Sequence, residues 1–300
     1  MTDGTEKNYV DSVNNITEEE YNPSVQKSQE KAHDETMWGK PARDIVTGIG
    51  NNGGIRPVRA IWELVQNARD VVGENKRAKI LFTRKTDSVV FQHDGIPFTH
   101  KTIEALIMQT SSKQATNAVQ VGQYGTGFLT PHLFGLSFKL TAPLLTSEEF
   151  QRYYKIDGFE IDRSPNDNEE MKNNLKAQWK ETQDWGNDLS ETTDKPYEHT
   201  IFCYESKGEQ AKLNAEEAFK AAPDMTPYVM TLNGNVESIE FVDEVEGTRV
   251  KFVSEASDLI FVAELADGNV FKHIVKRTTT KDGKESVKDY CVYLIISKDM

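Results

Sequence analysis

The segment from residue 55 to residue 72 constrains the fold most, because its apolar side chains recur at the spacing of a helix. These side chains are Val58, Ile61, Trp62, Val65, Ala68 and Val72. A helix of this kind is stable when its apolar face is buried against another layer. Two apolar runs follow, 79–83 and 88–91, and the polar residues Lys85-Thr86-Asp87 between them predict a β-hairpin.

Further elements are expected along the chain. Thr99 is expected to cap a helix that runs to about Gln109. The apolar stretch 128–145 predicts a helix followed by a strand, and Asn214 is expected to open a helix that Pro223 ends or interrupts. Strands are expected over 200–204, 236–242, 248–253, 259–262, 270–277 and 290–297.

Composition shifts divide the chain into regions. Residues 1–36 hold nine acidic residues, three lysines and few large apolar side chains, so they predict a flexible acidic arm. A main domain is expected over 37–232, with a charged insertion at 147–198 in which Met171, Leu175 and Trp179 mark an amphipathic helix. A β-rich region is expected over 233–300. Because its last strand ends beside the terminus, it is expected to belong to a longer chain.

Composition also limits the partners. The 300 residues carry 35 Lys and Arg against 48 Asp and Glu, a net charge of -13, which argues against direct binding of nucleic acid. No apolar run approaches the roughly 20 residues of a membrane helix, and the start lacks the apolar core of a secretory signal. Two cysteines are too few for a disulfide framework. A cytoplasmic protein without membrane contact is expected.

The other side of the 55–72 helix is polar. Glu63, Asn67 and Asp70 lie within roughly 60° of one another around the helix axis. These three residues are called the polar stripe below. An amide oxygen suits Mg²⁺, and a carboxylate one turn earlier could deprotonate a water that attacks a phosphate. The plainer interpretation is a solvated helix face.

Two glycine-rich segments are candidates for a phosphate-binding loop. Gly48-Ile-Gly-Asn-Asn-Gly53 matches the dinucleotide fingerprint, but no buried strand precedes it, so a flexible loop is the better interpretation. Gly122-Gln-Tyr-Gly-Thr-Gly-Phe128 has a different order of glycines, which would let backbone N–H groups turn toward an anion. A simple turn remains the alternative for this second loop.

Four segments in this order resemble the motifs of the GHKL, or Bergerat-fold, ATPases, the superfamily of gyrase, heat-shock chaperones, histidine kinases and MutL. They are Glu63-Leu-Val-Gln-Asn-Ala-Arg-Asp70, Asp94-Gly-Ile-Pro-Phe98, Thr110-Ser-Ser-Lys113 and Gly122–Phe128. The local sequence around His93-Asp-Gly most resembles the heat-shock-chaperone-like, sacsin-like branch of this superfamily. The resemblance covers about residues 38–145 and implies an α/β, or two-layer α+β, sandwich: a mixed, mostly antiparallel sheet under a helical layer.

The resemblance also implies roles, with ATP and Mg²⁺ as cofactors. Glu63 would be the general base and Asn67 the Mg²⁺ ligand. Asp94 would accept a hydrogen bond from the adenine amino group, Gly95 would let the base approach, and Asp70 would support that end of the pocket. The phosphates would meet Ser112 and Lys113 of the lid and the glycine loop, namely Gly122, Gln123, Tyr124, Gly125, Thr126, Gly127 and Phe128.

This chain departs from the family pattern at three positions. In one alignment His93 stands where the family has the adenine-binding Asp, so His93 and Asp94 are both candidates for that contact. Pro97 replaces a glycine, and Leu129 stands where relatives often have a lysine. Thr200 is expected near the adenine, with Thr248 as its rival.

The expected function is Mg²⁺-dependent ATP binding and hydrolysis that drives lid closure and association with a protein partner or with a second copy. The alternative, suggested by Leu129, is a nucleotide-gated binding or scaffold module with little hydrolysis. A histidine kinase is disfavoured because no histidine-bearing dimerisation helix lies upstream. A DNA-acting ATPase is disfavoured by the net charge of -13.

Overall fold

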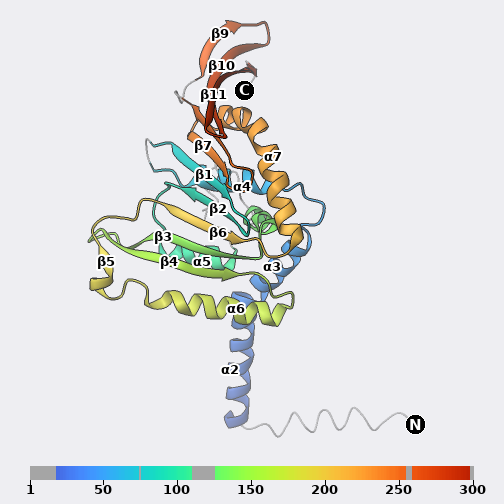
Figure 1. The fold of residues 1–300 in the computed structure, drawn as a ribbon. Helices are drawn as coiled ribbons and strands as arrows, with labels where there is room; N and C mark the ends of the chain where they lie inside the picture. The colour runs from blue at the N-terminus through green and yellow to red at the C-terminus, as the bar shows by residue number, and fades with distance from the viewer. Residues whose placement is uncertain (1–17, 74–75, 110–125, 255–258, 298–300) are drawn as a thin grey trace.

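The computed structural model describes residues 18–73, 76–109, 126–254 and 259–297. Helices pack against one sheet, and α2 extends away from it (Figure 1). The helical elements are α2 (Glu18–Asp34), the π-helix η1 (Glu35–Gly39), α3 (Lys40–Gly50), α4 (Val58–Asp70), α5 (His100–Met108), the 3-10 helix η2 (Thr126–Leu133), α6 (Asn168–Glu181), the 3-10 helices η3 (Thr182–Asp184) and η4 (Leu189–Glu191), and α7 (Glu209–Leu232).

The strands form a single sheet in the order β11-β10-β8-β7-β1-β2-β6-β3-β4-β5, with β9 paired to β10. Among the described strands only β1 and β7 pair in parallel. The strands are β1 (Ala78–Arg84), β2 (Ser88–His93), β3 (Ser137–Ser147), β4 (Arg152–Asp162), β5 (Thr192–Thr193), β6 (Thr200–Glu205), β7 (Val236–Asp243), β8 (Thr248–Ser254), β9 (Ile260–Glu264), β10 (Gly268–Lys281) and β11 (Lys284–Ser297).

Along the central strands, buried residues alternate with residues that are more exposed, so one face of the sheet is buried. In β1 the buried residues alternate along the strand, and they pair with buried residues of β2, as in Phe82 with Phe91. Phe91 pairs in turn with Phe202 of β6, and the rings of these two residues lie 5.6 Å apart. Helices α4, α5 and α7 contact β1, β3 and β7. Because alternation buries one face only, these strands and helices form two layers, and the predicted mixed, mostly antiparallel sheet under helices is confirmed.

Many expected elements are confirmed. The 55–72 segment forms α4, the hairpin forms β1 and β2, and Thr99 caps α5 through a reciprocal bond with Thr102. The helix marked by Met171 and Leu175 is α6, and both side chains are buried. The expected helix after Phe128 is instead a 3-10 helix, η2, that begins at Thr126.

The expected end of a helix at Pro223 is wrong. Helix α7 begins at Glu209 rather than Asn214 and continues through Pro223 and Pro227 to Leu232. Each proline removes one helical N–H and typically destabilises a helix interior by about 3 kcal/mol. Both prolines are buried, and α7 packs along β7, β8 and β10, so tertiary burial outweighs the local preference.

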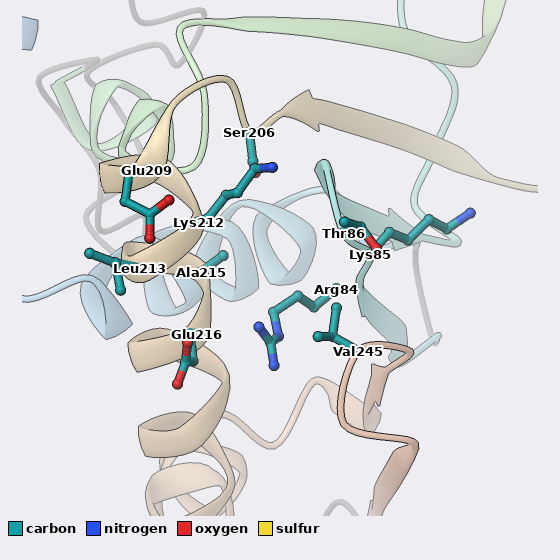
Figure 2. Close-up of a pocket in the computed structure, with 10 residues that line it drawn as sticks. All are labelled: Arg84, Lys85, Thr86, Ser206, Glu209, Lys212, Leu213, Ala215, Glu216 and Val245. Atoms are coloured by element: carbon teal, nitrogen blue, oxygen red, sulfur yellow. The ribbon is translucent and has the colours of Figure 1, made fainter.

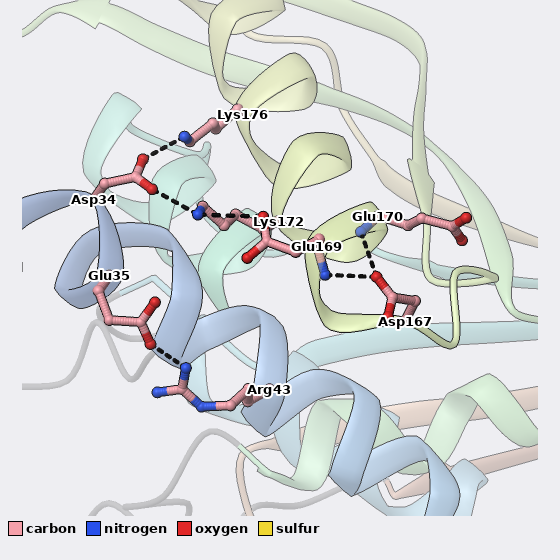
Figure 3. Close-up of polar contacts among 8 residues, drawn as sticks. All are labelled: Asp34, Glu35, Arg43, Asp167, Glu169, Glu170, Lys172 and Lys176. Carbon is pink, nitrogen blue, oxygen red and sulfur yellow. Dashed lines mark hydrogen bonds and ion pairs between the residues drawn. The ribbon is translucent and has the colours of Figure 1, made fainter. Parts of the chain in front are cut away.

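Helix α2 and the insertion 147–198 meet at a polar contact (Figure 3). Asp34, the last residue of α2, pairs with Lys172 of α6 at 2.6 Å and also with Lys176. The hydrogen bond from Lys172 holds the pKa of Asp34 below its ordinary value. Beside this contact the rings of Trp38 and Trp179 lie 5.5 Å apart. Helix α6 is thereby attached to η1 and α2, which extends away from the sheet (Figure 1).

Gly135 generates a prediction about the link between η2 and β3. A Cβ at this position would lie 2.2 Å from the carbonyl oxygen of Glu205 in β6. We expect Gly135→Ala to destabilise the fold by about 1–3 kcal/mol, because backbone must shift to admit the methyl group. Urea unfolding measures this change. Gly50→Ala is the matched control, since no atom lies within 4 Å of its Cβ position; equal loss in both variants would contradict the prediction.

Candidate functional site

The ends of β2 and β6 bring two candidate residues together. His93 and Thr200 are direct cross-strand partners on the helix-covered face of the sheet. They are 5% and 1% exposed. The His93 ring lies 5.3 Å from the ring of Phe91 and 6.2 Å from that of Phe202. The Thr200 hydroxyl is buried and has no hydrogen-bond partner in the structure, which is uncommon for a buried polar atom.

The loop after β2 is bound to the end of α4. The Ile96 N–H donates to the carbonyl oxygen of Val71 at 2.8 Å. A Cβ on Gly95 would lie 2.7 Å from Val71 Cγ2 and 2.9 Å from the Val71 oxygen. Only glycine fits this approach. Asp94 points toward β1 and not toward His93, because its Oδ1 accepts a 2.8 Å hydrogen bond from the Lys79 N–H of β1.

The polar stripe of α4 is not a solvated helix face. The side chains of Glu63 and Asp70 are 20% and 5% exposed. Arg59 Nε lies 3.2 Å from Glu63 Oε1, and Arg69 Nη2 lies 2.7 Å from Asp70 Oδ1. Between them, Asn67 Nδ2 is buried without a hydrogen-bond partner. The stripe therefore holds two paired carboxylates and one unsatisfied amide.

These parts are continuous in space. Asp70 precedes Val71, which contacts Gly95, and Gly95 lies two residues after His93. Helix α4 also contacts η2, whose Phe128 ring lies 5.6 Å from that of Phe202. The structure thus brings Asp70, Gly95 and Phe128 to the same end of the sheet as His93 and Thr200.

The rival threonine lies elsewhere. Thr248 pairs with Asp243, which is opposite Arg84 at the far end of β1. His93 instead pairs with Ile80 near the start of β1. Thr200, and not Thr248, therefore lies beside His93.

The predicted phosphate-binding residues fall partly outside the described part of the chain. Ser112, Lys113, Gly122, Gln123, Tyr124 and Gly125 lie outside the described residues. Thr126 and Gly127 form the first turn of η2. Their roles stay predictions.

Sequence reasoning missed the two arginines that accompany the polar stripe. Arg69 donates to Asp70 and, through Nη1, to Asn233 Oδ1 at 2.6 Å. Arg59 precedes Glu63 by four residues, the spacing at which helical side chains meet. This spacing of four residues can be read from the sequence and predicts the Arg59–Glu63 ion pair.

The other glycine segment is not a phosphate loop of the dinucleotide type. Gly48 and Gly50 lie within α3, which follows η1 rather than a strand, so the flexible loop expected here is wrong for residues 48–50. The rejection of the dinucleotide fingerprint is confirmed, since that motif needs a strand before its glycines.

A separate hollow of about 220 Å³ opens at the opposite end of β1 (Figure 2). Arg84 there pairs with Asp243 at 2.8 Å, and Lys212 pairs with Asp87 at 2.6 Å. Glu209 and Glu216 line the same hollow. Because positive and negative side chains both line this hollow, its charge favours binding neither of an anion nor of a cation.

Among the described residues, no group of His, Cys, Asp and Glu has the arrangement of a metal site. In the same part of the chain no helix is both long and apolar enough to cross a membrane.

No protein-family model matches the sequence, and no curated protein matches it. Solved structures with some likeness include the ATPase region of Saccharomyces cerevisiae topoisomerase II bound to ICRF-187 (dexrazoxane), at 13% identity and TM-score 0.33, covering 68% of this chain and 59% of that chain. The same region in a second structure has 12% identity and TM-score 0.34, covering 72% and 58%. The 43K ATPase domain of Thermus thermophilus gyrase B with an aminocoumarin has 12% identity and TM-score 0.35, covering 73% and 56%.

This chain therefore spans less than two thirds of each of these chains. At such low TM-scores the likeness carries no argument about ligands or activity.

His93 generates a prediction on pH dependence. Burial lowers its pKa from 6.5 to about 4, with a smaller contribution from His199. Below pH 6.5 the unfolded chain binds the proton and the folded chain does not, so stability is complete above pH 6.5 and falls toward pH 4. The slope is at most about 1.4 kcal/mol per pH unit.

We expect His93→Asn to lose less unfolding free energy than the unmodified protein between pH 7 and pH 5, measured by urea denaturation. The exposed His100 supplies the control His100→Asn. Parallel pH profiles for His93→Asn and the unmodified protein would contradict the assignment.

Proposed function

We propose that this chain is a GHKL-type domain that binds ATP with Mg²⁺ and hydrolyses it. The pocket would lie between the polar stripe of α4, the loop after β2 and the start of η2. The observation that carries the proposal is the unsatisfied Asn67 amide within a largely buried stripe, because a buried polar group without a partner needs a ligand to complete it.

Asn67 fits a metal ligand of the expected kind. Mg²⁺ keeps several waters and takes nucleotide phosphates as further ligands, so one protein oxygen is sufficient. The orphaned atom of Asn67 is the donor Nδ2, which an acceptor such as a phosphate oxygen would satisfy, and the amide oxygen would be presented to the ion. When bound, Mg²⁺ would neutralise phosphate charge.

Glu63 would act as the general base. Its carboxylate lies one turn before Asn67, is 20% exposed and has Arg59 as its partner at one oxygen. The other oxygen would orient and deprotonate the attacking water. Arg59, whose Nε lies 3.2 Å from Glu63 Oε1, would orient the carboxylate.

The nucleotide base would rest at the ends of β2 and β6. His93 and Thr200 are cross-strand partners at that place, and Gly95 lets the loop approach Val71 of α4 closely. Asp94 is engaged with the β1 backbone, so the proposal gives the base contact to His93. Backbone N–H groups of Gly122–Phe128, with Ser112 and Lys113, would bind the phosphates.

A second candidate function is nucleotide-gated binding with little hydrolysis. Leu129 is 4% exposed, and a Cβ on Gly48 would lie 2.4 Å from its Cδ1. It is thus a core side chain of the α3 contact and supplies no charge to a phosphate. With either function, ATP binding would close the lid and promote association with a second copy or with a protein partner.

The proposed roles of Glu63 and Asn67 can be separated. We expect Glu63→Gln to bind ATP but to hydrolyse it at least about 100-fold more slowly, because a general base typically contributes that factor or more. We expect Asn67→Ala to abolish the gain in ATP affinity on adding Mg²⁺. Calorimetric titration of ATP with and without Mg²⁺, together with phosphate release, measures both.

Glu104→Gln, on the exposed side of α5, is the control. Full turnover by Glu63→Gln would overturn its role. Binding by the unmodified protein with no phosphate release would favour the second function. Native mass measurement with a non-hydrolysable ATP analogue reports nucleotide occupancy and dimerisation together.

A further inference from the structure

Strand β11 is a free edge of the sheet. Among the described strands it stands at one end of the strand order, with β10 as its neighbour, and its register with β10 runs without a shift from Lys284 to Ser297. An edge strand presents unpaired backbone N–H and C=O groups, which natural proteins usually guard with charged side chains, prolines or bulges. Strand β11 contains neither a proline nor a bulge, so any protection must come from its charges.

The charges of β11 are confined to its first half. Residues 284–289 include two lysines, one glutamate and one aspartate, whereas residues 290–296, called the apolar run below, read Tyr-Cys-Val-Tyr-Leu-Ile-Ile. Tyr293 and Ile295 in this run are 60% and 68% exposed, and Phe261 of the nearby strand β9 is 58% exposed. The first half of the edge is therefore protected, and the apolar run is open to pairing with another strand.

The turn of the hairpin determines which backbone groups face outward. Lys281 pairs with Lys284, and the two residues between them, Asp282 and Gly283, have φ of 51° and 72°, as in a type I′ turn. The residues that flank such a turn are hydrogen-bonded to each other. Because the direction alternates along an uninterrupted antiparallel ladder, the even-numbered residues of β11 bond to β10. The odd-numbered residues, Tyr293 among them, direct both groups to the free edge.

The apolar run is complementary to itself. Two copies of β11 can pair antiparallel across a two-fold axis, with Tyr293 of one copy facing Tyr293 of the other. Each residue of the run then faces the residue equally far from Tyr293 on the other side. The resulting pairs are Val292 with Leu294, Cys291 with Ile295, and Tyr290 with Ile296. Every pair in this register joins two apolar side chains, and such cross-strand pairs stabilise a sheet.

Other registers lack this property. Pairing centred on Cys291 would place Asp289 opposite Tyr293 and Lys288 opposite Leu294. Each of these pairs brings a charge against an apolar side chain and removes part of its water, which is unfavourable. The sequence of β11 therefore favours the register centred on Tyr293.

We propose that two copies of this chain form a dimer through β11, paired antiparallel about Tyr293, so that their sheets join into one. Because both copies use the same edge, the assembly closes at two. None of the residues assigned to nucleotide or Mg²⁺ lies on β11. The inference therefore does not rest on the proposed function, and the dimer is expected to form without ATP.

The first test measures the mass of the full chain by sedimentation across the micromolar range, without nucleotide. We expect a dimer whose dissociation constant rises at least about tenfold in Tyr293→Lys, because like charges directly opposite each other in paired strands are destabilising. Val287→Lys is the matched control: this side chain is 53% exposed on the same strand but lies outside the apolar run. It should leave the dimer intact, and circular dichroism checks that both variants fold.

The second test determines the register with disulfides. In the Cys291→Ser background, Tyr293→Cys should form an intermolecular disulfide under mild oxidation, since facing Cα atoms lie about 5.5 Å apart at the axis. Val287→Cys in the same background should not. Cys291 is exposed in the single chain, but in the proposed register its two copies are offset by four residues, about 13 Å, so the unmodified protein should not cross-link there.

Each alternative outcome contradicts a stated part of the inference. A monomer at every concentration, or a dimer that Tyr293→Lys leaves unchanged, would overturn the β11 interface. A dimer that forms only with ATP and survives Tyr293→Lys would overturn it too, while supporting the association under the proposed function. Cross-linking through Cys291 in the unmodified protein would overturn the register. Failure to bind ATP would overturn the proposed function and leave the dimer unaffected.

Discussion

The close approach of Gly95 to Val71 is the contact on which the candidate site depends. It attaches the loop after β2 to the end of α4 through the 2.8 Å bond from Ile96 N–H to the Val71 oxygen. It joins the loop after β2 to the end of α4, which also contacts β1 and η2. The same loop supplies the Gly95 N–H that donates to Nδ1 of His93 at 3.0 Å, so one glycine both positions the loop and orients the imidazole two residues before it.

Much of this arrangement follows from local pattern. The amphipathic period of α4, the polar turn between β1 and β2 and the Thr99 cap are interactions within a few residues, and each was readable from the chain. The polar stripe was also readable, because helical geometry alone aligns Glu63, Asn67 and Asp70. What the pattern could not decide was whether this face meets water or protein.

The features that escaped prediction depend on distant contacts. Helix α7 continues through Pro223 because the sheet covers it, and sequence propensity contains no information about that burial. The opposite directions of the His93 and Asp94 side chains depend on strand alternation and on the Lys79 N–H of a neighbouring strand. The β10–β11 hairpin is longer than expected, although Asp282-Gly283, with φ of 51° and 72°, is a turn signal that the sequence did contain.

The parallel pairing of β7 with β1 has a mechanical consequence. β1 is hydrogen-bonded to β7 along one edge and to β2 along the other, and its Lys79 N–H holds Asp94. Strands β7, β8 and β10 follow one another outward from β1. The C-terminal hairpin is therefore joined by one continuous ladder of backbone hydrogen bonds, through β8, β7 and β1, to the loop beside α4.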